Sequence, residues 1–363
     1  MTERTRLLIV DDSRIFRSAL EEALAGADDI QVVDSVWSGA KALDSIRAHP
    51  PDVVTLDVAM PGLDGLETLA AIQQFNSGHP EAPPVGVIMV SAHTQAGAKT
   101  TIEALTSGAF DFITKPSESS AEASVASLRQ QLLLKVRQFM KHRRPAPFLG
   151  EPALRLTKPL PRFALPTAGR RIAPQAVLIA VSTGGPRALH TMLPDLCRQV
   201  ELPVFIVQHF PLGFTHFLAE NLQRHCAHRV IEAEDGGLVQ PRTVYFGPIG
   251  RHLLVRRSAD GHVHTALNEQ PPENGFRPSA DVLFRSAAAV YGASAVALVL
   301  TGMGQDGSAG LGPLKRAGAY VIAQDEATSV VWGMPERAVA TGHVDEVLPL
   351  DCIPAAVGAL IHS

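Results

Sequence analysis

Residues 7–12 read Leu-Leu-Ile-Val-Asp-Asp, and this stretch decides how the first part of the chain folds. A short apolar run that ends in two acids is typical of a buried parallel strand with polar side chains at its carboxyl end. Similar apolar runs follow at 53–56, 85–90 and 110–113, and the segments between them have the apolar spacing of helices. Strands that alternate with helices predict βαβ units and a parallel sheet.

A second set of apolar runs begins after residue 175 and predicts a second, larger α/β sheet. Its runs occupy residues 176–181, 204–207, 244–246, 253–255, 295–300 and 320–323, and helical spacing is found at 186–198, 214–226, 279–290 and 310–317. The stretch 242–267 has little helical sequence between its strands, which favours an antiparallel pair there.

The two sets are separated by a helix and a proline-rich segment. Residues 121–141 have an apolar face at helical spacing. From Pro145 to Pro174 the chain holds seven prolines with Arg and Lys between them, a composition typical of an extended interdomain linker. We therefore expect one domain over 1–125, a helix and linker over 126–172, and a second domain over 173–363. Both domains are expected to be doubly wound, mainly parallel α/β sheets.

Composition excludes several classes of protein. The 363 residues include 32 Lys and Arg against 36 Asp and Glu, a net charge of −4 that argues against an electrostatic grip on nucleic acid. No apolar run has the length of a membrane span, so no membrane insertion is expected. The apolar run near the N-terminus is too short for a signal peptide, and the acids that follow it do not suit one. We therefore expect a cytoplasmic protein. Three widely spaced cysteines predict free thiols.

Acidic side chains gather at the strand ends of the first domain. Asp11 and Asp12 lie where its first strand ends, and Asp57 ends the strand that starts near residue 53. Three carboxylates at one sheet edge repel one another unless a hard cation neutralises them, and Mg²⁺ suits such an oxygen-only site. Ser91 adds a hydroxyl and Lys115 an ammonium at the ends of the next strands. The set predicts a carboxylate nucleophile, a metal ion and two groups that can hold a phosphoryl oxygen.

These motifs occur in the order of a known family: Asp-Asp-Ser-Arg at 11–14, Leu-Asp-Val-Ala-Met-Pro-Gly-Leu-Asp-Gly at 56–65, Ser-Ala at 91–92 and Thr-Lys-Pro at 114–116. Together they closely resemble the receiver domain of two-component response regulators, whose fold is flavodoxin-like. The resemblance implies that a histidine kinase phosphorylates Asp57. It also implies Mg²⁺ ligation by Asp12, Asp57, the carbonyl of Ala59, and Asp11 through water.

The same resemblance assigns a switch. Ser91 and Lys115 are expected to sense the phosphoryl group, and Phe112 is the aromatic residue that turns with it. Ala59 stands where close relatives often have Glu, which leaves the lifetime of the acyl phosphate open.

Three segments of the second domain carry candidate catalytic residues. Ser182 lies between a strand and a helix N-terminus, where amides and the helix dipole favour the negative charge that a nucleophilic attack creates. A helix N-cap or a phosphate-binding loop explains this serine about equally well. His209 follows a strand and can act as general base, although most histidines are structural. Asp306, in a glycine-rich turn after the most apolar strand, can orient the imidazole or serve only the turn.

Four motifs of this domain together resemble a second family: Ser-Thr-Gly-Gly at 182–185, Gln-His at 208–209, Phe-Arg-Pro-Ser-Ala-Asp-Val-Leu-Phe at 276–284 and Gly-Met-Gly-Gln-Asp-Gly at 302–307. With the receiver, they resemble the chemotaxis response-regulator protein-glutamate methylesterases over almost the whole chain. The resemblance implies a Rossmann-like esterase domain. Val181 replaces the small residue, usually Ala, that precedes the serine in the family, and we expect slight crowding there.

The resemblance also implies a mechanism. Ser182 attacks glutamyl methyl esters of methyl-accepting chemoreceptors, His209 transfers the proton, and Asp306 orients His209. The N–H of Met303, with amides near Gly184 and Gly185, stabilises the oxyanion, and no cofactor is needed for ester hydrolysis. Receptor glutamines are deamidated by the same chemistry. A chemotaxis histidine kinase donates the phosphoryl group, and the unphosphorylated receiver blocks the esterase. Arg277 is a candidate substrate contact or a structural residue.

Two other functions remain open on the sequence. A DNA-binding response regulator predicts a small basic effector domain, whereas this one is long and rich in strands. A non-catalytic interaction module predicts loss of the serine, histidine or aspartate, and all three are present.

Overall fold

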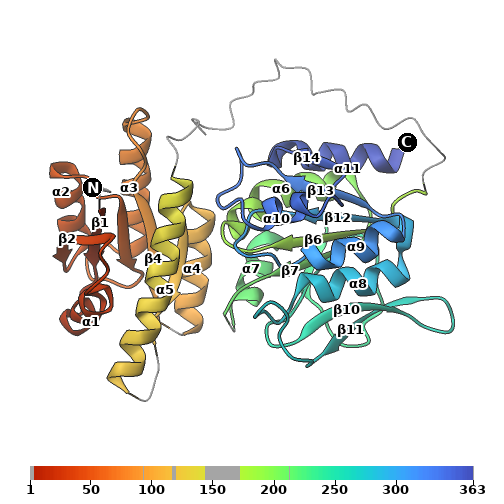
Figure 1. The fold of residues 1–363 in the computed structure, drawn as a ribbon, viewed down its shortest axis with the longest axis horizontal. Helices are drawn as coiled ribbons and strands as arrows, with labels where there is room; N and C mark the ends of the chain where they lie inside the picture. The colour runs from red at the N-terminus through yellow and green to blue at the C-terminus, as the bar shows by residue number, and fades with distance from the viewer. Residues whose placement is uncertain (1–3, 93, 117–119, 144–171, 212, 363) are drawn as a thin grey trace. The chain divides into compact units, whose positions relative to one another are not determined.

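The structure is a computed structural model that describes residues 4–92, 94–116, 120–143, 172–211 and 213–362. The chain divides into two compact units, Met1–Arg155 and Leu156–Ser363. Each unit contains its own α/β sheet with helices packed on it, as Figure 1 shows. The predicted fold class is confirmed for both units.

The first unit has a five-stranded, wholly parallel sheet in the order β2-β1-β3-β4-β5. Helices α1 and α5 pack against each other, and α2 and α3 form another packed pair, with α3 also contacting α4. The elements are β1 (Thr5–Val10), α1 (Arg14–Leu24), β2 (Ile30–Val36), α2 (Gly39–Ala48), β3 (Val53–Asp57), α3 (Gly65–Gly78), β4 (Gly86–Ser91), α4 (Gln95–Thr106), β5 (Asp111–Thr114) and α5 (Ala121–His142).

The start of α3 shows how local chemistry fixes an element beside the acidic cluster. Asp64 accepts a hydrogen bond from the N–H of Glu67 at 2.9 Å, and the Glu67 carboxylate accepts one from the N–H of Asp64 at 3.0 Å. This capping box satisfies amide groups that the first helical turn leaves unpaired. The helix therefore begins at a fixed place only a few residues after β3 ends at Asp57.

Helix α5 packs on the first unit through one apolar face. Leu128, Leu132, Val136 and Phe139 are buried, as the helical spacing predicts. The Phe139 ring meets Phe110 edge-on, with ring centroids 5.1 Å apart. It also fills the space beside Gly86, where a Cβ atom would lie 2.4 Å from the ring. The expected boundary at residue 125 therefore falls inside this helix, and residues 126–143 of the expected connecting segment pack with the first unit. The proline-rich segment lies outside the described residues up to residue 171.

The second unit has a seven-stranded parallel sheet in the order β14-β13-β12-β6-β7-β9-β8. Strands β10 and β11 form a separate antiparallel pair, as expected, whereas β9 joins the main sheet. The strands are β6 (Ala176–Val181), β7 (Val204–Gln208), β8 (Arg229–Glu232), β9 (Thr243–Phe246), β10 (His252–Arg257), β11 (Val263–Asn268), β12 (Ala295–Val299), β13 (Tyr320–Gln324) and β14 (Glu346–Leu348).

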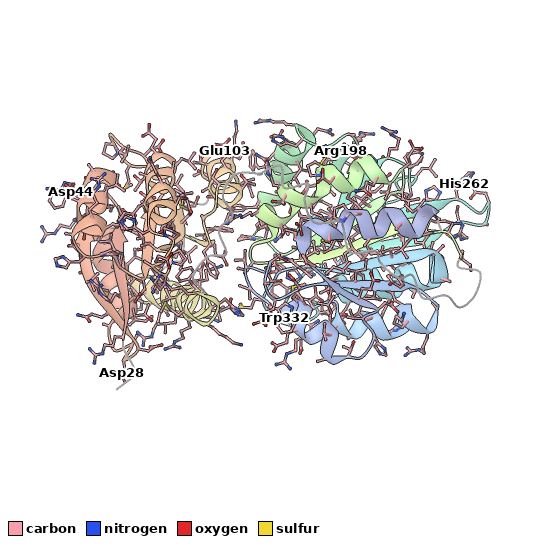
Figure 2. All side chains as sticks on the ribbon, turned by 90° about the horizontal axis from the view of Figure 1, so that it is seen from above. Asp28, Asp44, Glu103, Arg198, His262 and Trp332 are labelled. Carbon is pink, nitrogen blue, oxygen red and sulfur yellow. The ribbon has the colours of Figure 1, made fainter. Side chains whose placement is uncertain are left out.

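Helices cover both faces of this sheet. Helices α6, α7 and α11 form one group, and α8, α9 and α10 form the other, with β10 packed against α8. Their bounds are α6 (Gly185–Gln199), α7 (Phe214–Gln223), α8 (Ala280–Val290), α9 (Ser308–Arg316), α10 (Met334–Ala340) and α11 (Ile353–His362), with short 3₁₀ turns at Gly292–Ser294 and Leu350–Cys352. In Figure 2, His262 marks the turn of the β10–β11 hairpin, and Arg198 marks the last turn of α6.

The core of the second unit follows strand alternation. Ala176, Leu178 and Ala180 on β6 share one cluster with Leu283 and Phe284 of α8. The remaining residues of β6 face the other side of the sheet and are equally buried. All three cysteines are free, as expected. Among the described helices, none combines the length and apolar character needed to cross a membrane.

If α5 is an integral part of the first unit, replacing Phe139→Ala should remove a ring from its core. We expect a loss of about 3–5 kcal/mol in the free energy of unfolding of that unit, measured by chemical denaturation. Leu134→Ala is the matched control, because Leu134 lies on the same helix with 44% of its surface exposed. Equal losses for the two variants would contradict this packing.

Candidate active site and acidic cluster

The three candidate catalytic residues follow three adjacent strands of the second sheet. Ser182 comes directly after β6 and His209 directly after β7, and the two strands pair with Val181 opposite Gln208. Asp306 lies in the turn after β12, which pairs with β6 on its other side. The chain builds outward in opposite directions from β6, so the β6–β12 junction is the point where the strand order reverses. Ligand sites of open α/β sheets lie outside the carboxyl ends of strands at such a point.

Backbone hydrogen bonds fix the Ser182 loop. The Ser182 N–H donates to the carbonyl of Thr301 at 3.0 Å, and the Gly185 N–H donates to the carbonyl of Ser182 at 2.8 Å. The Gln208 amide also donates to the Ser182 carbonyl at 3.0 Å. The Gly185 N–H is thus bonded inside the loop, and a role in an oxyanion hole for the amides near Gly184 and Gly185 stays a prediction. Ser182 itself is 8% exposed at the N-terminus of α6.

Gly302 allows the turn after β12 to approach Ser182 closely. A Cβ atom at Gly302 would lie 2.8 Å from the Cβ of Ser182 and 2.4 Å from the Sδ of Met334. Any side chain here would therefore displace the serine. The Gly302 carbonyl is turned away and accepts from the N–H of Met334 at 2.8 Å. Met303 follows at this point of close approach.

His209 and Asp306 are in direct contact. The Nε2 of His209 lies 2.8 Å from the Oδ2 of Asp306. The Nδ1 of His209 is buried and has no hydrogen-bond partner among the described residues. The Phe276 ring stacks on the imidazole, with centroids 3.8 Å apart and planes at 6°. The imidazole is therefore held by one nitrogen and one face, and no hydrogen bond joins its second nitrogen to Ser182 in the described residues.

Asp306 is a fully buried carboxylate that caps the N-terminus of α8. It accepts hydrogen bonds from the Ser279 hydroxyl at 2.6 Å and from the Ala280 N–H at 2.7 Å. Asn274 adds a side-chain bond at 3.2 Å. Burial alone would raise the pKa of Asp306, but the contact with His209 and these donors lower it to about 2. The contact with His209, followed by the donors at the N-terminus of α8, thus keeps this buried aspartate ionised.

Sequence reasoning missed Asn274, and it included Phe276 and Ser279 in the motif at 276–284 without a role for either. Ser279 precedes a helix and matches an N-cap pattern, yet its hydroxyl donates to Asp306 and makes no cap to its own helix. Asn274 and Gly275 form an Asn-Gly pair, which signals a tight turn but not a contact with Asp306. Arg277 donates to the carbonyls of Glu269 and Gln270, so of its two expected roles the structure displays the structural one.

The acidic residues of the first unit come together as expected. Carboxylate oxygens of Asp11, Asp12 and Asp57 lie within 4.8 Å of one another. The Lys115 ammonium lies 2.8 Å from Asp11 and 3.1 Å from Asp57. An oxygen-only donor set with these distances fits Mg²⁺. Ser91 ends β4 and is fully buried, and its hydroxyl donates to the carbonyl of Ala92 at 3.3 Å.

Two further features bear on this cluster. The Phe112 ring is buried on β5, beside the Lys135 ammonium at 5.7 Å. Burial and the charge of Asp11 raise the pKa of Asp57 to about 6, although Lys115 acts in the opposite direction. The same two carboxylates raise the pKa of Lys115 against the effect of its own burial. A second cation near Asp57, in addition to Lys115, would therefore stabilise its ionised form.

Comparison with known proteins finds a family match for each of the two units. Residues 177–357 match the CheB methylesterase family model, and residues 7–125 match the response regulator receiver domain. A protein-glutamate methylesterase/protein-glutamine glutaminase from Koribacter versatilis is 40% identical over 97% of this chain and 95% of its own. One from Geobacillus kaustophilus is 41% identical over 98% of both chains. The chain belongs to the protein-glutamate methylesterase/protein-glutamine glutaminase family.

A solved structure supports the fold of the second unit within this family. The Thermotoga maritima CheB methylesterase catalytic domain covers 52% of this chain and all of its own, with 39% identity and a TM-score of 0.50. The family therefore accounts for the order of the two units, a receiver first and a methylesterase domain second.

The Asp57 carboxyl makes the receiver of this family member sensitive to pH. Ionising it costs folding free energy, so the free energy of unfolding should fall as pH rises from 3.8 to about 6 and stay lower above that. We expect Asp57→Asn to be more stable than the parent above this window, by about 2–3 kcal/mol in thermal denaturation with EDTA present.

Adding Mg²⁺ supplies the control for this prediction. It should raise the melting temperature of the parent much more than that of Asp57→Asn, because an amide is a poor ligand for this cation. Equal stability of the two proteins in EDTA at every pH would contradict the assigned cost of ionising Asp57.

Proposed function

We propose that this chain hydrolyses glutamyl methyl esters on methyl-accepting chemoreceptors, releasing methanol, and deamidates receptor glutamines by the same chemistry. The observation that carries the proposal is the buried His209–Asp306 pair beside Ser182, in a chain related over its full length to proteins named for both activities. The proposed reaction uses only protein groups.

The proposed nucleophile is Ser182, with His209 as its base. The hydroxyl proton moves to Nδ1 of His209, while Nε2 stays bonded to Asp306 and the imidazolium is stabilised by the charge of that carboxylate. These two nitrogens have the opposite roles in the serine-protease template, where Nε2 receives the serine proton. The ionised state of Asp306 supports this role, because a neutral carboxyl could not balance the charge that develops on the ring.

The proposed oxyanion donor is the N–H of Met303. Gly302 brings this backbone against Ser182, and the helix N-terminus of α6 adds its dipole. Attack by the serine oxygen forms a C–O bond and a tetrahedral oxyanion. Collapse of this intermediate breaks the bond to the methoxy group, which takes the proton from His209 and leaves as methanol.

Water completes the reaction. His209 accepts a proton from the water as its oxygen attacks the acyl carbon, and the serine leaves with that proton. The product is a glutamate side chain. With a glutamine substrate, ammonia leaves in the first step and the second step is unchanged.

The first unit is proposed to regulate this reaction. Asp57 accepts a phosphoryl group from a chemotaxis histidine kinase, and Asp11, Asp12, Asp57 and the carbonyl of Ala59 would hold Mg²⁺, which neutralises charge on the phosphoryl oxygens. Lys115 pairs with the phosphoryl group, and Ser91 and Phe112 respond to it. The unphosphorylated receiver is proposed to block the esterase, and phosphorylation shifts the population towards the open form.

Methanol release from methylated receptor membranes tests this function with the full chain. Ser182→Ala should abolish release while Asp57 still becomes phosphorylated by a small acyl-phosphate donor. Asp57→Asn should keep the basal rate and lose the stimulation by that donor. Release by Ser182→Ala at the parent rate would show that the nucleophile is assigned wrongly, and stimulation of Asp57→Asn would do the same for the phosphorylation site.

A further inference from the structure

The residues just before α8 form a tight turn that reaches both members of the His209–Asp306 pair. The Glu273 N–H donates to the carbonyl of Phe276 at 3.1 Å, and the Phe276 N–H donates back to the carbonyl of Glu273 at 2.9 Å. The two central residues have positive φ angles, 54° at Asn274 and 83° at Gly275. This is the pattern of a type I′ turn, for which Asn-Gly is the preferred pair. The backbone therefore presents the side chains of Asn274 and Phe276 in fixed directions.

Asn274 joins two buried carboxylates. Its amide nitrogen donates to Asp281 Oδ2 at 2.8 Å and to Asp306 Oδ1 at 3.2 Å. Both aspartates are fully buried, so their charges repel each other in a medium of low dielectric constant. One primary amide has two N–H groups, and here each can bond one carboxylate. Without this amide, Asp306 would lose a donor on Oδ1, the oxygen that does not face His209.

The turn is also anchored on its outer side. Glu273 forms an ion pair with Arg285 of α8 through both carboxylate oxygens. The Phe276 ring then lies flat on the His209 imidazole at 3.8 Å. One rigid turn thus contacts the carboxylate on one side and the ring that it orients on the other.

We propose that the Glu273–Phe276 turn is a positioning element of the esterase, in which Asn274 aligns the Asp306 carboxylate and Phe276 aligns the His209 ring. The proposal rests on the proposed function, because positioning matters only if this pair activates Ser182. Asn274 bonds Asp306 and Phe276 stacks on His209, so both are proposed to act through the pair. Loss of alignment should lower kcat and leave KM nearly unchanged.

The charged groups around Asn274 also bear on its role. Burial, together with the charge of Asp306, raises the pKa of Asp281 to about 6. The charged and titratable groups around Asn274 are Asp281 and Arg285 on α8, Asp306 before α9, His209 after β7, and Glu273 in the turn itself. A carboxylate in place of the Asn274 amide would lie beside those of Asp281 and Asp306. Its ionised form would be strongly disfavoured by their charges. Its protonated form would be tolerated, because a protonated carboxyl can still donate one hydrogen bond.

The decisive comparison is Asn274→Asp against Asn268→Asp in the full chain. The two changes add the same group, but Asn268 at the end of β11 uses its side chain to accept from the Gln270 N–H and not to hold Asp306. We expect kcat of Asn274→Asp to be roughly tenfold below the parent in neutral and alkaline buffer, the loss expected for one hydrogen bond to a charged group. The ratio of variant to parent should recover on acidification, while Asn268→Asp should stay within about twofold of the parent throughout.

Phe276 gives a second, independent comparison. Phe276→Leu should lower kcat because the flat stacking surface is lost, and Phe276→Tyr should restore it because the ring is kept. A purely structural role would lower melting temperature and activity together at each pH, so melting temperature is measured beside kcat at every pH. A flat ratio of Asn274→Asp to the parent across pH, or parent-like kcat for both Asn274→Asp and Phe276→Leu, would overturn the proposal.

A measurement that needs no activity separates this proposal from the proposed function. The imidazole N–H proton in the His209–Asp306 hydrogen bond can be followed by proton NMR in the parent and the aspartate variants. We expect its resonance to shift or broaden in Asn274→Asp and to be unchanged in Asn268→Asp. If the parent hydrolyses no ester but this shift is seen, the proposed function fails, and what stands is only that Asn274 aligns the His209–Asp306 pair. If the parent is active and the resonance is unchanged in Asn274→Asp, the positioning role fails alone.

Discussion

The arrangement of the second unit depends on one buried group, the Asp306 carboxylate. It has no exposure to water, and it stays ionised because the N-terminal amides of α8, the Ser279 hydroxyl and His209 all donate to it. Burying such a charge without these donors would cost several kcal/mol. The carboxylate in turn constrains the fold. Helix α8 must begin where the carboxylate lies, and the turn after β12 must place Asp306 at that point. The same constraint fixes the imidazole that Asp306 holds.

Both sites lie where the order of strands reverses. In the first sheet the reversal is between β1 and β3; Asp11 follows β1 and Asp57 ends β3. In the second it is between β6 and β12, which carry Ser182 and the turn to Asp306. At such a point the loops of neighbouring strands turn to opposite faces and leave a crevice at the sheet edge. The same architectural rule therefore applies at both the proposed phosphoryl acceptor and the proposed acyl-transfer site.

The sequence predicted the central strands and the apolar edge strand β5, and it missed the edge strands β2, β8 and β14, for a physical reason. Strands β3, β6 and β12 are buried along their whole length and appear as continuous apolar runs. Strands β2, β8 and β14 lie at sheet edges, are partly exposed, and contain polar residues that hide them. The site shows the same division. Ser182, His209 and Asp306 follow apolar strands and stand out, whereas Asn274 and Ser279 come from a turn and a helix start whose sequence signals describe local backbone and not distant contacts.

The most direct test of the central claim is the isosteric change Asp306→Asn in the full-length protein, with methanol release from methylated receptor membranes as the readout. The change keeps the shape of the site and removes the charge that holds the imidazole. We expect the rate to fall by about a thousandfold or more, with circular dichroism and Asp57 phosphorylation preserved. A variant that folds, is phosphorylated and still releases methanol within about tenfold of the parent would contradict the account.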